Sequence, residues 1–402
     1  MQTGDVMDFE LSDKAKLVEE QLSRFMDEYV YPAEREYAEQ SEEKPNEEPA
    51  IMLELRAKAR EIGLWNLFLP DDEWGAGLNN LEYTPLCEIM GRSGIAARVF
   101  NCQAPDTGNA EILAEFGTPE QKEKWLKPLL DGEIRSCFSM TEPEVSGADP
   151  TKLQTRAVRD GDDFVINGHK WFTSGAIGAA FAIAMVVTDP DAAPHERMSQ
   201  ILVPIDNPGF NIVRPVSVMG HIGGGGHCEI RYEDCRVPAS SVLGPVGSGF
   251  MIAQARLGPG RIHHCMRAIG MAERGFEIMC RNANSREVAG GLLNEKQFIQ
   301  EFVATSRMEI DQARLLTLHA AHKMDKFGKD QARQEISMIK VVVPNMMMNV
   351  LDRVIQSLGA LGVSDDTPVA AMWRNGRALR IADGPDEVHK MVIARRELKR
   401  FA

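Results

Sequence analysis

The sequence predicts an α+β protein of several domains: an N-terminal helical domain, a central β-barrel and a C-terminal four-helix bundle. The chain of 402 residues is too long for one ordinary domain. Apolar residues recur at helical spacing in its first and last parts. Between these parts, short apolar runs alternate with turn residues, as in strands. These changes of pattern place the three domains at residues 1–135, 136–245 and 246–402.

The N-terminal domain is expected to be helical throughout. Ser12 is a suitable N-cap, and apolar residues from Ala15 to Tyr29 follow it at helical spacing. Pro32 is expected to interrupt this first run. Further helices are predicted for residues 51–62, 81–90 and 119–130.

The middle domain is expected to consist of short strands that form a small barrel or sandwich. They are predicted for residues 153–157, 164–166, 181–187, 201–204, 209–213 and 228–232. Helical periodicity returns after Gly249, although Gly258-Pro259-Gly260 is expected to break any helix there. Long helices are then predicted for residues 261–280, 295–327 and 333–361.

Composition excludes several classes of function. The formal charge of −14 opposes nonspecific binding to nucleic acid or to an anionic membrane. Seven cysteines without a C-x-x-C pair are typical of a reducing, intracellular environment. No apolar run approaches the roughly twenty residues that span a bilayer, and the acidic start of the chain is not a targeting peptide. A cytoplasmic protein is therefore expected.

Asp383 is the strongest candidate for a reacting group. It follows a basic, apolar, helix-like run and precedes Gly384-Pro385, a step that breaks regular structure. Backbone could carry this carboxylate into a pocket, where it could take a proton from carbon. The alternative, which this segment alone favours, is that Asp383 or Asp386 caps the last helix.

Two segments of the middle domain end in small and hydroxyl residues. They are residues 137–149 and residues 167–175. Their backbone N–H groups and hydroxyls could bind a carbonyl-rich ring or a phosphate, and Trp171 could cover a planar ring. Ordinary polar strand ends are the alternative. A metal site is not expected, because His319 and His322 have no evident third ligand.

With these residues in view, the chain resembles the acyl-CoA dehydrogenase family over nearly its whole length. The motifs that carry the resemblance are Thr141-Glu142-Pro143, Trp171-Phe172-Thr173, residues 233–238, residues 244–250, Arg286 with Gln297, and residues 356–362. Residues 260–265 and 382–389 are most similar to a branch that includes proteins fused to kinase-like domains. The resemblance implies FAD as cofactor, bound by Phe138, Met140, Thr141, Ser146, Trp171, Phe172, Thr173, Arg286, Gln297, Gln356, Gly359, Gly362, Pro385 and Glu387.

The resemblance also implies the chemistry. Asp383 stands where the family has its catalytic Glu, and Arg261 would hold the CoA side of the substrate or orient the loop of the base. Asp383, desolvated and raised in pKa, would remove the α-proton of an acyl-CoA while the β-hydride passes to FAD, giving the trans-2-enoyl-CoA. Electron-transfer flavoprotein would take the electrons, as in fatty-acid β-oxidation.

Some expectations remain alternatives at this stage. The substrate could carry a 4-hydroxy or 4-phospho group, as in some relatives. Residues 356–362 imply a homo-oligomer, a dimer or a tetramer. A nitroalkane-oxidase-like flavoprotein, whose base is also an Asp, and an inactive homologue that only binds acyl-CoA are the competing functions. Asp383 is one methylene shorter than Glu, so its backbone must lie closer to the substrate.

Overall fold

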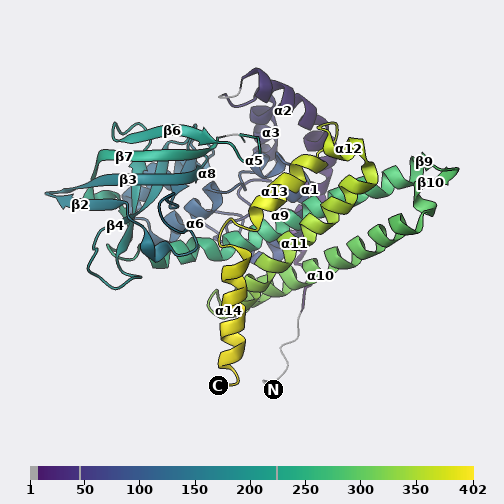
Figure 1. The fold of residues 1–402 in the computed structure, drawn as a ribbon. Coiled ribbons are helices and arrows are strands. Elements are labelled where there is room, and N and C mark those ends of the chain that lie inside the picture. The colour runs from purple at the N-terminus through teal and green to yellow at the C-terminus, as the bar shows by residue number, and fades with distance from the viewer. Residues whose placement is uncertain (1–7, 45–46, 223–224) are drawn as a thin grey trace.

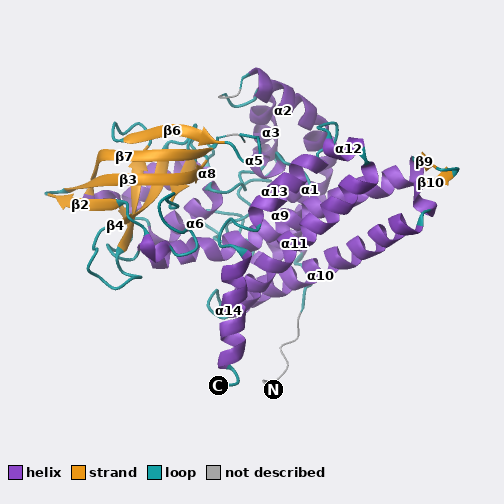
Figure 2. Ribbon diagram, viewed as in Figure 1, coloured by secondary structure: helices purple, strands orange, loops and turns teal. Residues whose placement is uncertain are grey.

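A computed structural model describes residues 8–44, 47–222 and 225–402 and divides into three parts (Figure 1). Helices make up the first and last parts, and the main sheet lies between them in sequence, at one end of the molecule (Figure 2). The predicted fold class is confirmed. None of the helices in the described residues combines the length and the apolar character needed to cross a membrane.

The N-terminal helices begin where the sequence predicts. Helix α1, Asp13–Phe25, is capped by Ser12, whose Oγ accepts a hydrogen bond from the N–H of Ala15 at 3.2 Å. A π-helical turn then leads directly into α2, Tyr31–Glu43, so the expected interruption at Pro32 is wrong. Pro32 lies in the first turn of α2, where a missing N–H costs little. The other helices of this part are α3 (Ala50–Glu61), α4 (Asn80–Gly91), α5 (Ala96–Val99), α6 (Asp106–Phe116), α7 (Pro119–Gln121) and α8 (Lys127–Leu130).

The strands of the middle part form one sheet in the order β6-β7-β3-β1-β4-β5-β8. The two ends of this order, β6 and β8, do not pair with each other in the described residues, so the sheet is not a closed barrel. However, β2 pairs with both β3 and β4, and this closes part of the sheet on itself. The strands are β1 (Ser136–Ser139), β2 (Arg156–Asp160), β3 (Asp163–Ser174), β4 (Phe181–Val187), β5 (Met198–Pro204), β6 (Phe210–Val216), β7 (His227–Pro238) and β8 (Val242–Leu243).

Helix α9, Gly249–Ser285, joins the sheet to the C-terminal bundle. It continues through Pro259, so the predicted break at Gly258-Pro259-Gly260 is wrong. A proline inside a helix costs about 3 kcal/mol. Buried apolar residues on both sides, such as Ile252 and Ile262, belong to one core, and each is worth about 1.5–3 kcal/mol. Packing therefore outweighs the local cost.

The bundle consists of long helices packed on α9. Helix α11 contacts α9, α10, α13 and α14, so it is the centre of the bundle. A hairpin of β9 and β10 caps the end that lies farthest from the main sheet (Figure 1). The elements of this part are β9 (Glu287–Val288), β10 (Gly291–Leu292), α10 (Gln297–Phe327), α11 (Arg333–Leu358), α12 (Ala360–Val363), α13 (Val369–Leu379) and α14 (Asp386–Lys399).

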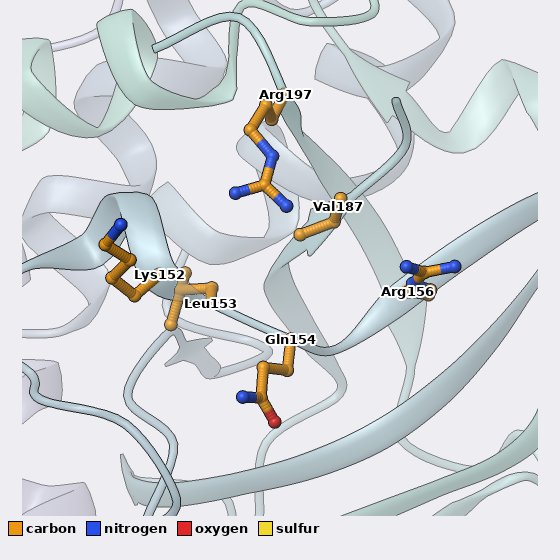
Figure 3. Close-up of a pocket in the computed structure, with 6 residues that line it drawn as sticks. All are labelled: Lys152, Leu153, Gln154, Arg156, Val187 and Arg197. Carbon is orange, nitrogen blue, oxygen red and sulfur yellow. The ribbon is translucent and has the colours of Figure 1, made fainter. Parts of the chain in front are cut away.

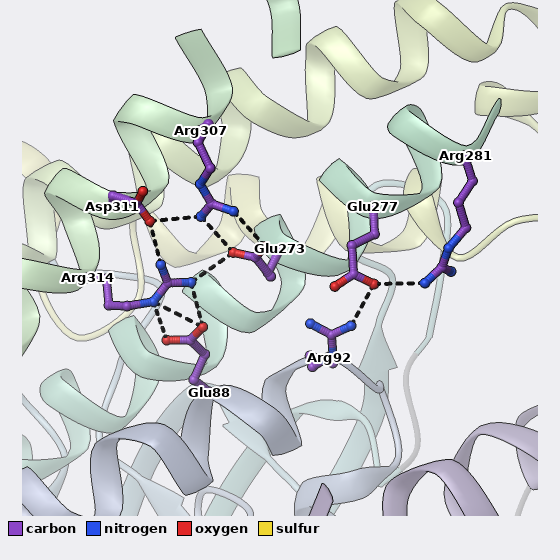
Figure 4. Close-up of polar contacts among 8 residues, drawn as sticks. All are labelled: Glu88, Arg92, Glu273, Glu277, Arg281, Arg307, Asp311 and Arg314. Carbon is purple, nitrogen blue, oxygen red and sulfur yellow. Dashed lines mark hydrogen bonds and ion pairs between the residues drawn. The ribbon is translucent and has the colours of Figure 1, made fainter. Parts of the chain in front are cut away.

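A network of ion pairs joins helices α4, α9 and α10 (Figure 4). Glu273 of α9 lies 2.8 Å from both Arg307 and Arg314 of α10. Arg314 also reaches Glu88 of α4 at 2.7 Å. The Glu273 side chain is only 15% exposed, so solvent screens these pairs less than it would screen surface pairs. The network fixes the N-terminal part against the bundle.

Candidate functional site

The loop that carries Asp383 connects α13 to α14. Asp383 has a φ of +57°, the left-handed region that a non-glycine residue rarely adopts. The N-cap of α14 is Pro385, which has no side-chain capping bond, so the interpretation of Asp383 or Asp386 as a helix cap is wrong. Asp386 is instead buried and accepts hydrogen bonds from Arg380 at 2.9 Å and from Asn345 at 3.0 Å. These bonds fix the end of the loop where α14 begins.

Lys340 of α11 binds the same loop from the interior of the bundle. Its Nζ donates to the carbonyl oxygens of Leu379 at 2.8 Å and Ala382 at 2.9 Å. Lys340 is 1% exposed, and burial lowers its pKa although Asp383 raises it. Two carbonyls thus take the place of the water that an ammonium group loses on burial.

Arg261 and His389 bind the next carbonyl. Arg261 donates from Nε to the backbone oxygen of Asp383 at 3.0 Å, and Nε2 of His389 lies 3.3 Å from the same oxygen. Arg261 is partly buried and contacts the loop, which is one of the two roles that the sequence suggested for it. Backbone contacts on every side therefore fix the unusual conformation of Asp383.

The Asp383 side chain points toward cationic groups of the bundle. Its Oδ2 lies 3.1 Å from Nε2 of His264, and the side chain is 23% exposed. Burial raises the pKa of Asp383, but the hydrogen bond from His264 and the charges of Arg256 and Lys340 outweigh burial. The pKa is therefore lowered, and the expectation of a raised pKa is wrong.

The residues predicted to bind the flavin ring lie on β1, on β3 and in the turn after β1. The backbone N–H of Trp171 donates to the backbone carbonyl of Thr141 at 2.7 Å. The hydroxyls of Thr173 and Ser139 are 3.2 Å apart. The indole Nε1 of Trp171 is buried and has no partner in the described residues, so a donor is available to a bound group. This wall suits a planar ring with carbonyl acceptors, as FAD would supply.

A buried ion pair supports the turn after β1. Lys170 and Glu142 lie 2.8 Å apart, with their side chains 0% and 1% exposed. Glu142 also accepts from the backbone N–H groups of Gln154 at 2.7 Å and Thr155 at 2.9 Å. Burial lowers the pKa of Lys170 to about 8 although Glu142 raises it. The turn that contains Thr141 is thus held rigidly.

Helix α9 brings this wall and Asp383 together. The guanidinium of Arg256 lies over the Phe138 ring, 4.1 Å from its centroid. The same cation acts on the pKa of Asp383. Met140 packs against a buried cluster that includes Ala253, one turn before Arg256. The ring-binding wall and the carboxylate therefore face a shared stretch of α9.

The remaining predicted FAD residues are not all at this place. Arg286 and Gln297 flank the β9–β10 hairpin, and Gln356, Gly359 and Gly362 lie at the end of α11 and in α12 (Figure 1). Ser146 lies in the loop after β1, where its Oγ accepts from the N–H of Ala148 at 3.3 Å. Pro385 and Glu387 adjoin Asp383. Within one chain, the predicted residues thus form two separate groups.

A second feature of the middle domain is a cavity of about 470 Å³ (Figure 3). Arg197 donates to the carbonyl of Thr151 at 3.1 Å, while its buried Nε has no partner in the described residues. No acidic side chain lines this cavity, so it can accept an anion. Its lining residues are Lys152, Leu153, Gln154, Arg156, Val187 and Arg197.

Sequence reasoning missed several residues around Asp383, namely His264, Arg267, Arg256 and Lys340. A weak signal existed, because Arg261, His264 and Arg267 recur at every third position and so share a helix face. Lys340 gave no such signal. His319 and His322 belong to no group of metal ligands in the part of the chain that the structure describes.

A β domain that carries the predicted ring-binding wall lies beside a helical bundle that presents one carboxylate, an arrangement that suits an oxidoreductase with a planar cofactor. Models of the three acyl-CoA dehydrogenase domains match in order, the N-terminal domain at residues 12–133, the middle domain at 137–235 and the C-terminal domain at 247–398. The chain belongs to the acyl-CoA dehydrogenase family and is an enzyme of that kind.

Individual relatives agree with this assignment. FadE2 of Mycobacterium tuberculosis, assigned as an acyl-CoA dehydrogenase, is 52% identical over 98% of both chains. Acyl-CoA dehydrogenase family member 10 of mouse is 48% identical over 97% of this chain, which spans 37% of the mouse protein. A solved structure from Mycobacterium abscessus, assigned to the same enzymes, has a TM-score of 0.95 and 46% identity, and covers 98% of this chain and 100% of its own.

Proposed function

We propose that the protein oxidises an acyl-CoA thioester to the trans-2-enoyl-CoA, with FAD as cofactor and Asp383 as the base. The observation that carries this proposal is the position of Asp383. Arg256 of α9 acts on the Asp383 carboxylate and also stacks on Phe138 of the predicted flavin wall. A carboxylate beside a ring-binding wall is the arrangement that removal of an α-proton and a β-hydride requires.

Asp383 would act through both its side chain and its backbone. The carboxylate would take the α-proton. No carbonyl of the described residues accepts from the N–H of Asp383, so that donor is free for the thioester oxygen, where negative charge develops. Arg261 and Lys340 would hold the loop so that both groups stay in place.

FAD, when bound, would accept the β-hydride. Thr141, Thr173 and Trp171 would bind and shield its ring, with Phe138, Met140, Phe172, Ser146, Pro385 and Glu387 around it. The orphan indole N–H of Trp171 supports this fit. Arg286, Gln297, Gln356, Gly359 and Gly362 would contact the cofactor of a neighbouring copy, so the enzyme would be a dimer or tetramer.

The substrate would carry its CoA nucleotide across the middle domain. Lys152, Arg156 and Arg197 supply positive charge around the cavity of that domain, which suits the phosphates of CoA. The cations of Arg256 and Lys340 act on Asp383 and would lie near the reacting carbons. A 4-phospho substituent on the acyl chain could pair with them, and a 4-hydroxyacyl-CoA is the other substrate that we propose.

The electrons would pass to an electron-transfer flavoprotein, and the reaction would belong to fatty-acid β-oxidation. A cytoplasmic location stays a prediction.

An anaerobic screen tests the main proposal. Purified protein should be yellow, and a short, medium, long, branched or 4-substituted acyl-CoA should bleach its flavin. Asp383→Asn should stop the bleaching. If Asp383→Asn bleaches as fast as the unchanged protein, Asp383 is not the base.

One observation favours a second candidate, oxidation of nitroalkanes. A carboxylate with a lowered pKa is a weak base, and nitroalkanes are far stronger carbon acids than thioesters. Oxygen consumption with nitroethane and none with acyl-CoA would establish this alternative. A colourless protein that FAD cannot reconstitute would instead indicate an inactive acyl-CoA-binding homologue.

A further inference from the structure

His264 lies between a cation and the carboxylate of Asp383. On one side, Nη2 of Arg267 is 3.2 Å from Nδ1 of His264. On the other side, Nε2 of His264 is 3.1 Å from Oδ2 of Asp383. All three residues are partly buried, and His264 and Arg267 lie one turn apart on α9.

The contact with Arg267 determines which ring nitrogen carries the proton. A guanidinium has only donors, so Nδ1 of His264 must be the acceptor and bear no proton. A ring without a proton on Nδ1 is neutral, and burial, which lowers the pKa of His264 although Asp383 raises it, favours this form. The single proton of the neutral ring is then on Nε2, which faces Asp383.

We propose that His264, with its tautomer fixed by Arg267, is a positioning residue for Asp383. It binds Oδ2 and leaves Oδ1 as the oxygen that takes the proton. This inference rests on the proposed role of Asp383 as the base.

The short side chain makes such positioning necessary. Asp383 reaches one methylene less far than the Glu of the family, so rotation about its side-chain bonds would move the reacting oxygen out of reach. A misplacement of this size is costly, since about 1 Å can change a rate by two orders of magnitude. The bond to His264 also keeps the carboxylate ionised, at the expense of basicity.

Other groups facing Asp383 act on its charge as well and must stay unchanged in a test. They are Arg256, Arg261 and Cys265 of α9, Lys340 of α11 and His389 of α14, while Asp386 of α14 acts on Lys340 in turn.

The test compares three substitutions of His264 in the full-length holoenzyme. His264→Leu removes the donor, His264→Asn keeps an amide too short to reach Asp383, and His264→Gln places an amide N–H near the position of Nε2. The rate constant of flavin reduction by acyl-CoA is measured against pH. In the Leu and Asn variants the acid-side midpoint should rise by about one pH unit, a tenfold change in ionisation, and the plateau rate should fall. His264→Gln should restore both.

A second measurement needs no substrate. Infrared titration follows the protonated carboxyl band of Asp383, identified by its absence in Asp383→Asn. Its midpoint should rise in His264→Leu and His264→Asn. The control is His263→Leu, because His263 is adjacent and even more deeply buried but contacts Tyr83 instead of Asp383.

The outcomes separate the two proposals. A protein that no acyl-CoA reduces would refute the proposed function, yet the infrared midpoints would still decide the role of His264. Midpoints unchanged in the Asn variant would overturn the positioning role, as would a Gln variant that behaves like Asn. If His264→Leu does not fold, the Asn and Gln pair decides alone.

Discussion

Lys340 donates a hydrogen bond to the carbonyl oxygen of Ala382 at 2.9 Å, and so fixes the peptide bond whose N–H belongs to Asp383. This peptide bond is trans, so its N–H points away from Lys340. A cation inside the bundle thus fixes the direction of the N–H that we propose as the donor to the thioester oxygen.

Lys340→Met should therefore reduce catalysis more than substrate binding. The variant removes two partly buried hydrogen bonds from a charged donor, which costs about 1–3 kcal/mol each. Urea unfolding should show the lower stability, and stopped-flow kinetics the slower flavin reduction. Lys390→Met, at an exposed position of α14, is the control. A folded Lys340→Met protein that reduces its flavin at the original rate would exclude the role.

The lowered pKa of Asp383 predicts a flat pH profile. A proton acceptor must be ionised, and Asp383 stays ionised down to below the ordinary aspartate pKa of about 3.9. The rate constant of flavin reduction should therefore not change between neutral pH and about that value, and should fall only below it. An acid limb near neutral pH would contradict this. The charge also contributes stability that is present above the ordinary pKa and lost as pH falls through the lowered one.

Glu273→Gln should destabilise the bundle by about 1–3 kcal/mol, between the values for exposed and fully buried pairs. Burial raises the pKa of Glu273, but hydrogen bonds from Arg307 and Arg314 outweigh it, and the pKa is lowered. The difference from the unchanged protein should thus shrink as pH falls below about 4.3, the ordinary pKa of Glu. Chemical unfolding at several pH values measures this. Arg281→Ala, whose side chain is 77% exposed, should change little.

Local patterns predicted the elements but not their long-range contacts. The strand at 181–187 was predicted to the residue, because it is a continuous buried apolar run between turns. The break at Pro259 was wrong, because the core that holds α9 comes from residues distant in sequence. Periodicity reports one element at a time and cannot weigh such packing.

The same limit applies to the site. Asp383 could be singled out because its Gly-Pro neighbours and its family position are local in sequence. The lowered pKa could not be foreseen, since it depends on His264 and Lys340, which reach Asp383 only through the fold. The side chain was visible in the sequence, and its electrostatic surroundings were not.

The cavity in the middle domain predicts a distinction between substrates. Arg197→Ala and Lys152→Ala should raise KM for acyl-CoA, because each removes a cation that would face the phosphates of CoA. The acyl-pantetheine thioester has no nucleotide, so its kinetics should be the same in both variants. Lys124→Ala, a substitution of an exposed lysine outside this cavity, is the control. Equal losses with both substrates would mean that the cavity does not bind the nucleotide.

The two separate groups of predicted FAD residues lead to a test of shared sites. Arg256, which stacks on Phe138, lies in α9, and Arg286 immediately follows the end of that helix, roughly 45 Å away at 1.5 Å per residue. If both groups contact FAD, they must contact the cofactors of different copies. Thr141→Val with Trp171→Ala should abolish FAD binding at one group, and Arg286→Ala with Gln356→Ala at the other.

Mixed oligomers of these two double variants should regain flavin. A copy with an intact wall would meet a copy with intact Arg286 and Gln356, which restores one complete site in each such pair. Bound flavin is measured by its absorbance after co-expression with two affinity tags and purification through both. Because each variant is defective alone, any flavin in the mixture comes from a site built by two copies. A mixture that stays colourless would show that at least one of the two groups does not bind FAD.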